Sequence, residues 1–253
     1  MTKVVAIVNQ KGGVGKTTTA INLSACLAAE NQRTLIIDTD TQGNATSGLG
    51  FSKDEIDVTV YEVFTSQNNI TEAILHSELD YLHIIASNVQ LAGASVELVD
   101  THERERILKK AIDSIRPNYD YVFIDCPPSL GLITLNCLVA ADSVLIPLQC
   151  EYYALEGMSE LLDTIMLVQN ELNPGLEIEG ILMTMYDART NLSKQVLSEV
   201  KSYFKDKVYN TIIPRNVRLG EAPSFGKPII LYDPWAPGAK AYLELAKEVM
   251  VNG

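Results

Sequence analysis

Eight residues near the amino terminus restrict the possible folds more than any other feature of this chain. Residues 11–18 read Lys-Gly-Gly-Val-Gly-Lys-Thr-Thr, and they lie between the apolar run Val4–Val8 and a segment with helical periodicity. Glycines let backbone N–H groups approach an anion, and the amino end of a helix favours negative charge. A strand, a glycine-rich turn and a helix in this order therefore predict a phosphate-binding loop rather than a simple flexible turn.

Two lysines stand in this loop. Lys16 is placed to reach the β- and γ-phosphates of a nucleotide, while the Thr17 hydroxyl is placed to ligate Mg²⁺. The usual pattern has a glycine five positions before Gly15, where this chain has Gln10, and Lys11 follows it. One lysine suffices for bound phosphates, so Lys11 needs another explanation. The loop residues expected to bind nucleotide are Lys11, Gly12, Gly13, Val14, Gly15, Lys16, Thr17 and Thr18.

Apolar and periodic segments alternate along the rest of the chain. The runs read as strands are Val4–Val8, Thr34–Ile37, Leu82–Ala86, Tyr121–Asp125, Ser143–Pro147, Ile181–Met185 and Val208–Ile213, with Ile229–Tyr232 as a last edge strand. The segments read as helices are Thr17–Ala29, Glu103–Ile115, Ala154–Asn170, Ser193–Phe204 and Gly238–Val251. Short helices are expected within residues 51–80, and a polar switch loop at 42–48. The alternation predicts an α/β fold, a doubly wound and mostly parallel sheet flanked by helices, as one domain over 1–253.

Composition excludes several classes of protein. The chain of 253 residues is 47% apolar, enough for a sizeable core, and the first apolar run ends too soon for a signal peptide or a membrane span. Its four cysteines are Cys26, Cys126, Cys137 and Cys150, far apart and without a Cys-x-x-Cys pair. We therefore expect reduced thiols in the cytosol, and neither zinc nor an iron–sulfur cluster inside one chain.

Charge is unevenly distributed. The net charge is −12, yet residues 189–227 hold eight basic residues against only Glu199, Asp206 and Glu221, so that segment carries +5 and the remainder −17. A local basic face on an acidic body is what a salt-sensitive DNA contact needs. Composition equally allows a set of solvated surface charges. The eight basic residues are Arg189, Lys194, Lys201, Lys205, Lys207, Arg215, Arg218 and Lys227.

Three aspartates follow predicted strands. Asp125 ends the clearest apolar run and precedes Cys-Pro-Pro, a position suited to hold Mg²⁺ through water. Asp38 and Asp40 lie two apart on an extended segment and so share a side. One carboxylate is expected to serve Mg²⁺ and the other, Asp40, to position the attacking water, although either can instead cap a turn. The predicted metal residues are thus Thr17, Asp38 and Asp125, and the predicted catalytic residues are Lys11, Lys16 and Asp40.

The loop and the segment Asp-x-Asp-x-Gln-Gly-Asn-Ala-Thr resemble the deviant Walker-A ATPases, specifically the ParA/Soj partition proteins. The resemblance runs the full length and includes Ile124–Ser129, Gln149–Gly157 and Ile213–Leu219. The loop motif of residues 11–18 is shared with MinD and nitrogenase iron protein. The segments Gln149–Gly157 and Ile213–Leu219 are more specific to the chromosomal Soj branch.

The resemblance implies a cycle driven by ATP and Mg²⁺. ATP would support a face-to-face homodimer in which Lys11 touches the phosphates of the other subunit. The dimer would bind double-stranded DNA without sequence preference, and slow hydrolysis would dissolve it. A ParB/Spo0J-type centromere-binding protein would stimulate that hydrolysis. These properties imply a cytoplasmic, nucleoid-associated protein that supports chromosome or plasmid segregation and has no membrane partner.

The resemblance also assigns residues outside the loop. The DNA-contacting arginines of the family match Arg189 and Arg218, with Lys194 and Lys201 as helpers. The adenine edge is expected near Met185, Pro214 and Asn216. The family proline after the second aspartate is Thr41 here, which frees φ and restores an N–H, so a more mobile switch loop is expected.

Alternative functions make different demands on the sequence. A MinD-like membrane-positioning ATPase needs a basic amphipathic helix at the carboxyl end, and the charges of residues 240–251 balance. A dethiobiotin-synthetase-like ligase needs a second substrate pocket, for which the sequence has no distinct motif. An iron protein needs two converging thiolates per subunit, and the separation of Cys126 and Cys150 does not support such a cluster. Because the chain starts directly with its first strand, no N-terminal helix-turn-helix extension is expected, and hence no sequence-specific repression by this chain alone.

Overall fold

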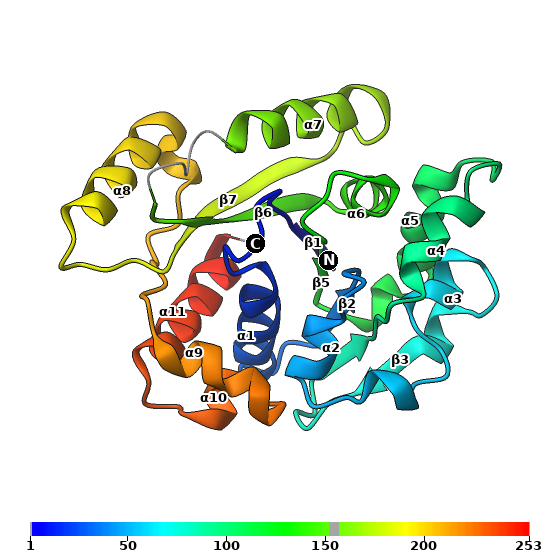
Figure 1. Ribbon diagram of the computed structural model, residues 1–253, viewed down its shortest axis with the longest axis horizontal. Coiled ribbons are helices and arrows are strands. Elements are labelled where there is room, and N and C mark those ends of the chain that lie inside the picture. The colour runs from blue at the N-terminus through cyan, green and yellow to red at the C-terminus, as the bar shows by residue number, and fades with distance from the viewer. Residues whose placement is uncertain (1, 152–156, 253) are drawn as a thin grey trace.

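A seven-stranded sheet forms the centre of the computed structural model, which describes residues 2–151 and 157–252 (Figure 1). The strand order is β3-β4-β2-β5-β1-β6-β7, and only the β3–β4 pair is antiparallel. The predicted doubly wound, mostly parallel sheet is therefore confirmed. The strands are β1 (Lys3–Ile7), β2 (Thr34–Asp38), β3 (Ile74–His76), β4 (Leu82–Ile85), β5 (Tyr121–Asp125), β6 (Ser143–Gln149) and β7 (Glu177–Thr184).

The register of the central strands brings three loops together. Asp125 at the end of β5 is the Cα partner of Ile7 on β1 and of Asp38 on β2. These three strands therefore end at one level. The predicted phosphate and metal residues lie at these strand ends or in the segments that follow them, so they begin side by side at the carboxyl edge of the sheet.

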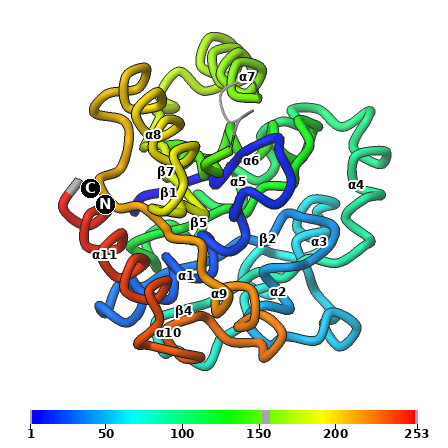
Figure 2. Tube along the Cα trace, turned by 60° about the vertical axis from the view of Figure 1, so that its left-hand side comes forward, coloured from blue at the N-terminus to red at the C-terminus, as the bar shows by residue number. Residues whose placement is uncertain are grey.

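Helices cover both faces of the sheet (Figures 1 and 2). Side chains alternate along each strand, so Val122 and Ile124 of β5 pack toward one helical layer while Phe123 packs toward the other. The first layer contains α3 to α8, and the second contains α1, α9, α10 and α11. The helices are α1 (Lys16–Ala29), α2 (Asn44–Gly48), α3 (Val60–Phe64), α4 (Leu91–Glu97), α5 (Ile107–Ile115), α6 (Leu132–Ala140), α7 (Met158–Glu171), α8 (Asn191–Phe204), α9 (Val217–Glu221), α10 (Ile229–Tyr232) and α11 (Pro237–Asn252).

Two predicted strands are wrong. Residues 208–213 form an isolated bridge from Val208 to Ile181 and no strand. The amides of Tyr209 and Ile213 donate to carbonyls of β7, but those of Asn210 and Thr211, between them, donate to the Glu248 carboxylate at 2.7 and 2.9 Å and interrupt the ladder. Residues 229–232 form the helical turn α10, not an edge strand. Its first amide, that of Ile229, donates to Asn22 Oδ1 at 2.7 Å, so a partner on α1 sets the local conformation.

Several boundaries also differ from expectation. The predicted switch loop contains the helical turn α2, and residues 51–80 contain β3 in addition to short helices. The helix predicted from Glu103 begins as a 3₁₀ turn and becomes α5 only at Ile107. The helix predicted from Ala154 is α7, which starts at Met158, and residues 152–156 lie outside the described part of the chain.

The carboxyl-terminal helix α11 packs its apolar stripe against the body. Tyr242, Leu245, Ala246 and Val249 are buried in one cluster with residues of α1. The stripe is thereby occupied by an internal contact. None of the helices in the described residues is long and apolar enough to cross a membrane.

Candidate nucleotide-binding site

The predicted phosphate loop joins β1 to α1 at the carboxyl edge of the sheet. Gly13 and Gly15 have φ values of 76° and 95°, a left-handed backbone that side-chain-bearing residues rarely adopt. Gly15 is the N-cap of α1, and no side chain caps the first turn. The free N–H groups of that turn are therefore available to an anion.

Lys16 is held inside this loop. Only 7% of the residue is exposed, and its Nζ donates to the carbonyl of Lys11 at 3.1 Å. Burial lowers the pKa of Lys16, while the negative charges of Asp125 and Asp40 act in the opposite direction. A buried cation surrounded by backbone amides is a strong attractor for phosphate oxygens.

Asp125 is a buried carboxylate without a partner. It is fully buried, and neither carboxylate oxygen has a hydrogen bond within the described residues. Burial raises the pKa of Asp125 well above its usual range, the nearby Asp38 charge raises it further, and the Thr17 hydroxyl and Lys16 oppose this shift. An uncompensated buried carboxylate is costly, so the position fits a divalent cation beside Thr17.

Asp38 has a different environment from Asp125. Its carboxylate accepts hydrogen bonds from the Thr46 amide at 2.9 Å, the Thr46 hydroxyl at 2.8 Å and the Asp40 amide at 3.1 Å. Burial raises the pKa of Asp38 to about 6, against the lowering effect of those bonds. The carboxylate thus fixes the segment 40–46, and it does not line the phosphate cavity. Asp40 does line that cavity.

Two cavities meet at the loop. The first, about 510 Å³, lies over the glycines, Lys16, Thr17 and Asp40, and the second, about 480 Å³, lies over Asn216 and Tyr242. Both are lined by Gly15, Thr18 and Met185, so the two cavities adjoin at these residues and we treat them as two compartments of one site. Its two compartments suit the phosphates and the base of a nucleotide.

The predicted base-binding residues fall around the second compartment. Met185 lies at the junction and has a φ of 51°, which is unusual for a residue with a side chain. Asn216 lines the compartment, and its Oδ1 is buried with no partner among the described residues. Pro214 does not line it, although its neighbours Ile213 and Arg215 do.

Two further side chains support the loop and were not predicted. The Thr184 hydroxyl at the end of β7 donates to the Val14 carbonyl at 2.8 Å. Tyr242 of α11 lies 3.1 Å, oxygen to oxygen, from the Thr19 hydroxyl of α1. No local pattern identifies either residue, because both contacts connect segments far apart in the sequence.

Lys11 points away from the buried part of the site. Its side chain is 46% exposed and forms an ion pair with Glu151, just after β6. Sequence analysis did not single out Glu151, although it lies in the segment 149–157 that resembles the partition proteins. Lys11 is therefore at the surface above the phosphate loop, accessible to another molecule.

The predicted DNA-binding residues do not line the nucleotide cavities, although Arg218 stands between Val217 and Leu219, which do. Arg189, before α8, has an 88% exposed side chain and pairs with both carboxylate oxygens of Asp187. These bonds lower the pKa of Asp187 to about 2. Arg218 of α9 pairs with Glu221 at 2.8 Å. Two exposed lysines, Lys194 and Lys201, lie on α8.

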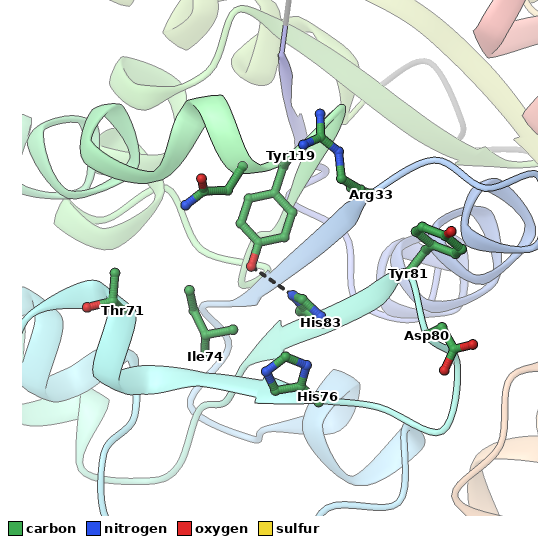
Figure 3. Close-up of a pocket in the computed structure, with 9 residues that line it drawn as sticks. Arg33, Thr71, Ile74, His76, Asp80, Tyr81, His83 and Tyr119 are labelled. Carbon is green, nitrogen blue, oxygen red and sulfur yellow. Dashed lines mark hydrogen bonds between the residues drawn. The ribbon is translucent and has the colours of Figure 1, made fainter.

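Another cavity, of about 320 Å³, lies at the opposite end of the sheet (Figure 3). Its walls include Arg33, Tyr81 and Tyr119, which precede β2, β4 and β5. The Tyr119 hydroxyl and His83 Nδ1 point toward each other at 2.9 Å (Figure 3). None of the predicted site residues lines this cavity.

Comparison with known proteins agrees with the loop geometry. The model of a family described as an AAA domain matches residues 2–178. The sporulation initiation inhibitor protein Soj of Bacillus subtilis is 59% identical over 253 residues, covering 100% of each chain. The chromosome partitioning protein ParA of Myxococcus xanthus is 56% identical over 248 residues, covering 98% of this chain and 88% of the relative. The chain belongs to the ParA/Soj family of chromosome-partitioning ATPases.

Solved structures place the ParA/Soj chain within a wider group of P-loop proteins. Cobyrinic acid a,c-diamide synthase from Mycobacterium smegmatis, crystallised with ADP and magnesium, is 38% identical with a TM-score of 0.87, covering 99% of this chain and 94% of that one. The cell division ATPase MinD of Pyrococcus furiosus is 26% identical with a TM-score of 0.82, covering 100% of both chains. The predicted ParA/Soj family and P-loop fold are confirmed.

Proposed function

We propose that this ParA/Soj protein is an ATP-dependent switch for DNA partition. The ATP-bound homodimer binds double-stranded DNA without sequence preference. Hydrolysis is slow, depends on Mg²⁺ and is stimulated by a ParB/Spo0J-type centromere-binding partner, after which DNA is released. The protein acts in the cytoplasm on the nucleoid and not on a membrane.

The observation that carries this proposal is the position of Lys11. The loop already encloses one lysine, Lys16, beneath the phosphate compartment, whereas Lys11 is half exposed at its mouth. Lys11 does not line the phosphate compartment, so a role toward the phosphates of its own subunit does not account for it. It is suitably placed to meet a nucleotide held by another subunit, which makes the nucleotide part of a dimer interface.

Binding follows from the residues of the first compartment. The amides of residues 12–18 and the Lys16 ammonium hold the phosphate chain. Thr17 and Asp125 would hold Mg²⁺, since Asp125 is a buried carboxylate with no other partner among the described residues. Asp38 does not contact the metal directly in this proposal; it fixes the segment that follows β2 through its bonds to Thr46. A bound Mg²⁺ would neutralise charge on the phosphate oxygens as the phosphoryl group passes to water.

Asp40 is the residue we assign to the attacking water. It lines the phosphate compartment, and its own Oδ1 accepts the Gln42 amide at 3.0 Å, which orients the carboxylate. The free oxygen holds water in line and accepts its proton. No arginine lines this compartment among the described residues, which supports slow hydrolysis in the absence of a partner.

The second compartment receives the base. Met185 and Asn216 line it, together with Ile213 and Arg215, the neighbours of Pro214. Asn216 carries both donor and acceptor groups, and its unpartnered Oδ1 suits the exocyclic amine of adenine. Arg189 and Arg218, helped by Lys194 and Lys201, contact DNA phosphates. The burial of the α11 stripe favours DNA over a MinD-like membrane surface.

Size and DNA binding measured together test the proposal. With a non-hydrolysable ATP analogue and Mg²⁺, sedimentation should give a species of twice the 27.8 kDa chain mass, and random-sequence duplex should be retained only under that condition. Affinity should fall steeply as salt rises. Lys11→Ala should bind the analogue but remain a single subunit, while Lys110→Ala, on α5, should behave as wild type.

Two results would contradict the proposal. Single subunits at high protein concentration with the analogue would remove the dimer on which it depends. Strong ATP-dependent pelleting with anionic vesicles, with no binding to duplex, would instead assign the protein to a membrane-positioning role.

A further inference from the structure

The chain has one tryptophan, and its side chain is exposed. Trp235 is 81% exposed, more than any other large aromatic residue in the described part of the chain. It lies in the short connection between α10 and α11. A single exposed apolar side chain is ordinary on a protein surface, so the neighbours of Trp235 decide whether a partner covers the ring.

The connection that carries Trp235 is not a loose loop. It reads Pro234-Trp235-Ala236-Pro237, and the Ala236 amide donates to the Asp233 carbonyl at 3.1 Å while the Ala236 side chain is buried. Two prolines fix φ on either side of the indole-bearing residue and its neighbour. The ring is thus held outward by an ordered turn.

One carboxylate links Trp235 to Arg218. The Trp235 amide donates to Asp233 Oδ1 at 3.2 Å, and the Arg218 Nε lies 3.4 Å from Asp233 Oδ2. The two residues therefore lie on either side of a single side chain. Figures 1 and 2 both show α9, α10 and the start of α11 side by side.

Close packing keeps this arrangement fixed. A Cβ on Gly238, in the first turn of α11, would lie 2.7 Å from Leu219 Cγ of α9, so the two helices are in tight contact at this point. Glu221 of α9 accepts from Arg218 at 2.8 Å and from the Tyr232 hydroxyl at 3.2 Å. Arg218 and Trp235 form one rigid surface, which we call the Arg–Trp surface.

We propose that Trp235 contacts duplex DNA together with Arg218, its indole packing against the sugar–phosphate backbone beside the phosphate that Arg218 holds. The inference rests on the proposed function and names a further residue of its DNA interface. An indole offers an apolar face for deoxyribose and an N–H donor for a phosphate oxygen, and neither reads sequence. DNA is the favoured occupant because the surface is continuous with the arginine already assigned to it.

The single tryptophan makes the test direct. Wild-type protein is bound to a random-sequence 40-base-pair duplex with a non-hydrolysable ATP analogue and Mg²⁺, and acrylamide quenching of tryptophan emission is measured. Saturating DNA should reduce the quenching constant at least about two-fold, because the ring becomes covered. Unchanged quenching with DNA fully bound would overturn the inference and leave the proposed function intact.

Substitutions separate an apolar contact from a charge contact. Trp235→Ala should weaken duplex binding about five- to ten-fold without changing the slope of log affinity against log salt, whereas Arg218→Ala should lower that slope. Trp235→Phe should retain part of the affinity. Tyr81→Ala, at the opposite end of the sheet, is the aromatic control and should bind as wild type.

Other outcomes are equally decisive. Equal duplex affinity for Trp235→Ala and wild type would overturn the inference. A blue shift of the emission with anionic vesicles but not with duplex would also overturn it, by assigning the ring to a lipid surface. Failure of wild type to bind duplex under any condition would refute the proposed function itself, and the inference with it.

Discussion

Lys11, Arg189 and Arg218 each form an ion pair with a carboxylate of the same subunit. Lys11 pairs with Glu151 and Arg189 with Asp187, while Arg218 pairs with both Glu221 and Asp233. In the proposed cycle all three cations act on other molecules, so these internal pairs compete with function. Exposed ion pairs of this kind are weak and exchange readily, so they moderate an interaction rather than prevent it.

Removing the partner of Lys11 should therefore favour dimers. With the ATP analogue and Mg²⁺, Glu151→Gln should lower the dimer dissociation constant about two- to five-fold, the range that a surface pair allows. Sedimentation equilibrium measures it, with Glu171→Gln on α7 as the matched control. A higher dissociation constant would mean that Glu151 supports the dimer rather than competing with it.

Asp125 combines a functional position with a cost in stability. Burial raises its pKa, so the folded protein holds this proton more tightly than the unfolded chain does. That contribution to stability is complete below a pH of about 4, the unfolded pKa, and is lost as pH rises through the folded pKa. Without Mg²⁺ and nucleotide, the site therefore weakens the fold near neutral pH.

Asp125→Asn should be more stable and inactive. Without Mg²⁺ at pH 7.5 its Tm should exceed that of wild type by about 3–10 °C, and the difference should shrink toward pH 4. Mg²⁺-dependent hydrolysis should be lost. Thermal unfolding across pH gives the answer, with the exposed Asp206→Asn as control; a lower Tm would mean that Asp125 has a stabilising partner.

At the scale of elements, the segment that follows β2 is held at Thr46 and lines the phosphate cavity at Asp40 and Gln42. Thr46 bonds to Asp38 and also accepts the Ser87 amide at 2.9 Å, which ties α2 to the chain after β4. Asp40 lies between this anchor and the phosphate compartment. The anchor thus sets the position of Asp40, and Thr41 lies in the span where a more mobile backbone was expected.

Gly43 is the point where this segment is least tolerant of change. Its φ is 58°, and a Cβ would lie 2.6 Å from the Ser87 carbonyl oxygen. Gly43→Ala should shift Asp40 and reduce kcat about 100-fold, while nucleotide affinity changes less than five-fold because Lys16 is untouched. Single-turnover hydrolysis and nucleotide titration measure the two effects, with Gly175→Ala as the unstrained control. Wild-type turnover would show that Asp40 does not depend on this segment.

The elements also show what sequence can and cannot predict. The β1–loop–α1 unit and β5 were predictable because their own residues determine them: glycines at left-handed positions and continuous apolar runs. The conformations of residues 208–213 and 229–232 were not predictable from their own residues. Glu248 accepts from an amide of the first segment and Asn22 from an amide of the second, and both partners are distant in sequence. The same holds within the site. Lys16 and Asp125 follow from local motifs, whereas Thr184 and Tyr242 reach the loop only through the fold.

At the scale of the whole molecule, an acidic protein is proposed to bind an acidic polymer. The net charge is −12, so any duplex contact must be confined to a small basic surface. We propose that Arg189 and Arg218 provide it, from the β7–α8 connection and from α9. Both are exposed and neither lines a nucleotide compartment, so we expect nucleotide binding to survive their removal.

Arg189→Ala combined with Arg218→Ala should lose duplex binding and keep the ATP-dependent dimer. Four phosphate contacts per dimer would disappear, so any residual binding should show a salt slope smaller by about 3.6. Mobility shifts across a salt series, with sedimentation in parallel, measure both properties, and Lys110→Ala is the control. An unchanged shift would place the DNA surface elsewhere on the molecule.

The common end level of β1, β2 and β5 has a consequence for how this protein can change over time. Ile7, Asp38 and Asp125 are aligned across three strands that two hydrogen-bonded ladders join. Exchanging one apolar residue for another in these strands leaves that alignment intact, whereas inserting or deleting a single residue would offset one loop from the other two and turn its side chains to the opposite layer. Descendants of this gene can therefore change the apolar residues of β1, β2 and β5, but not the number of residues in these strands.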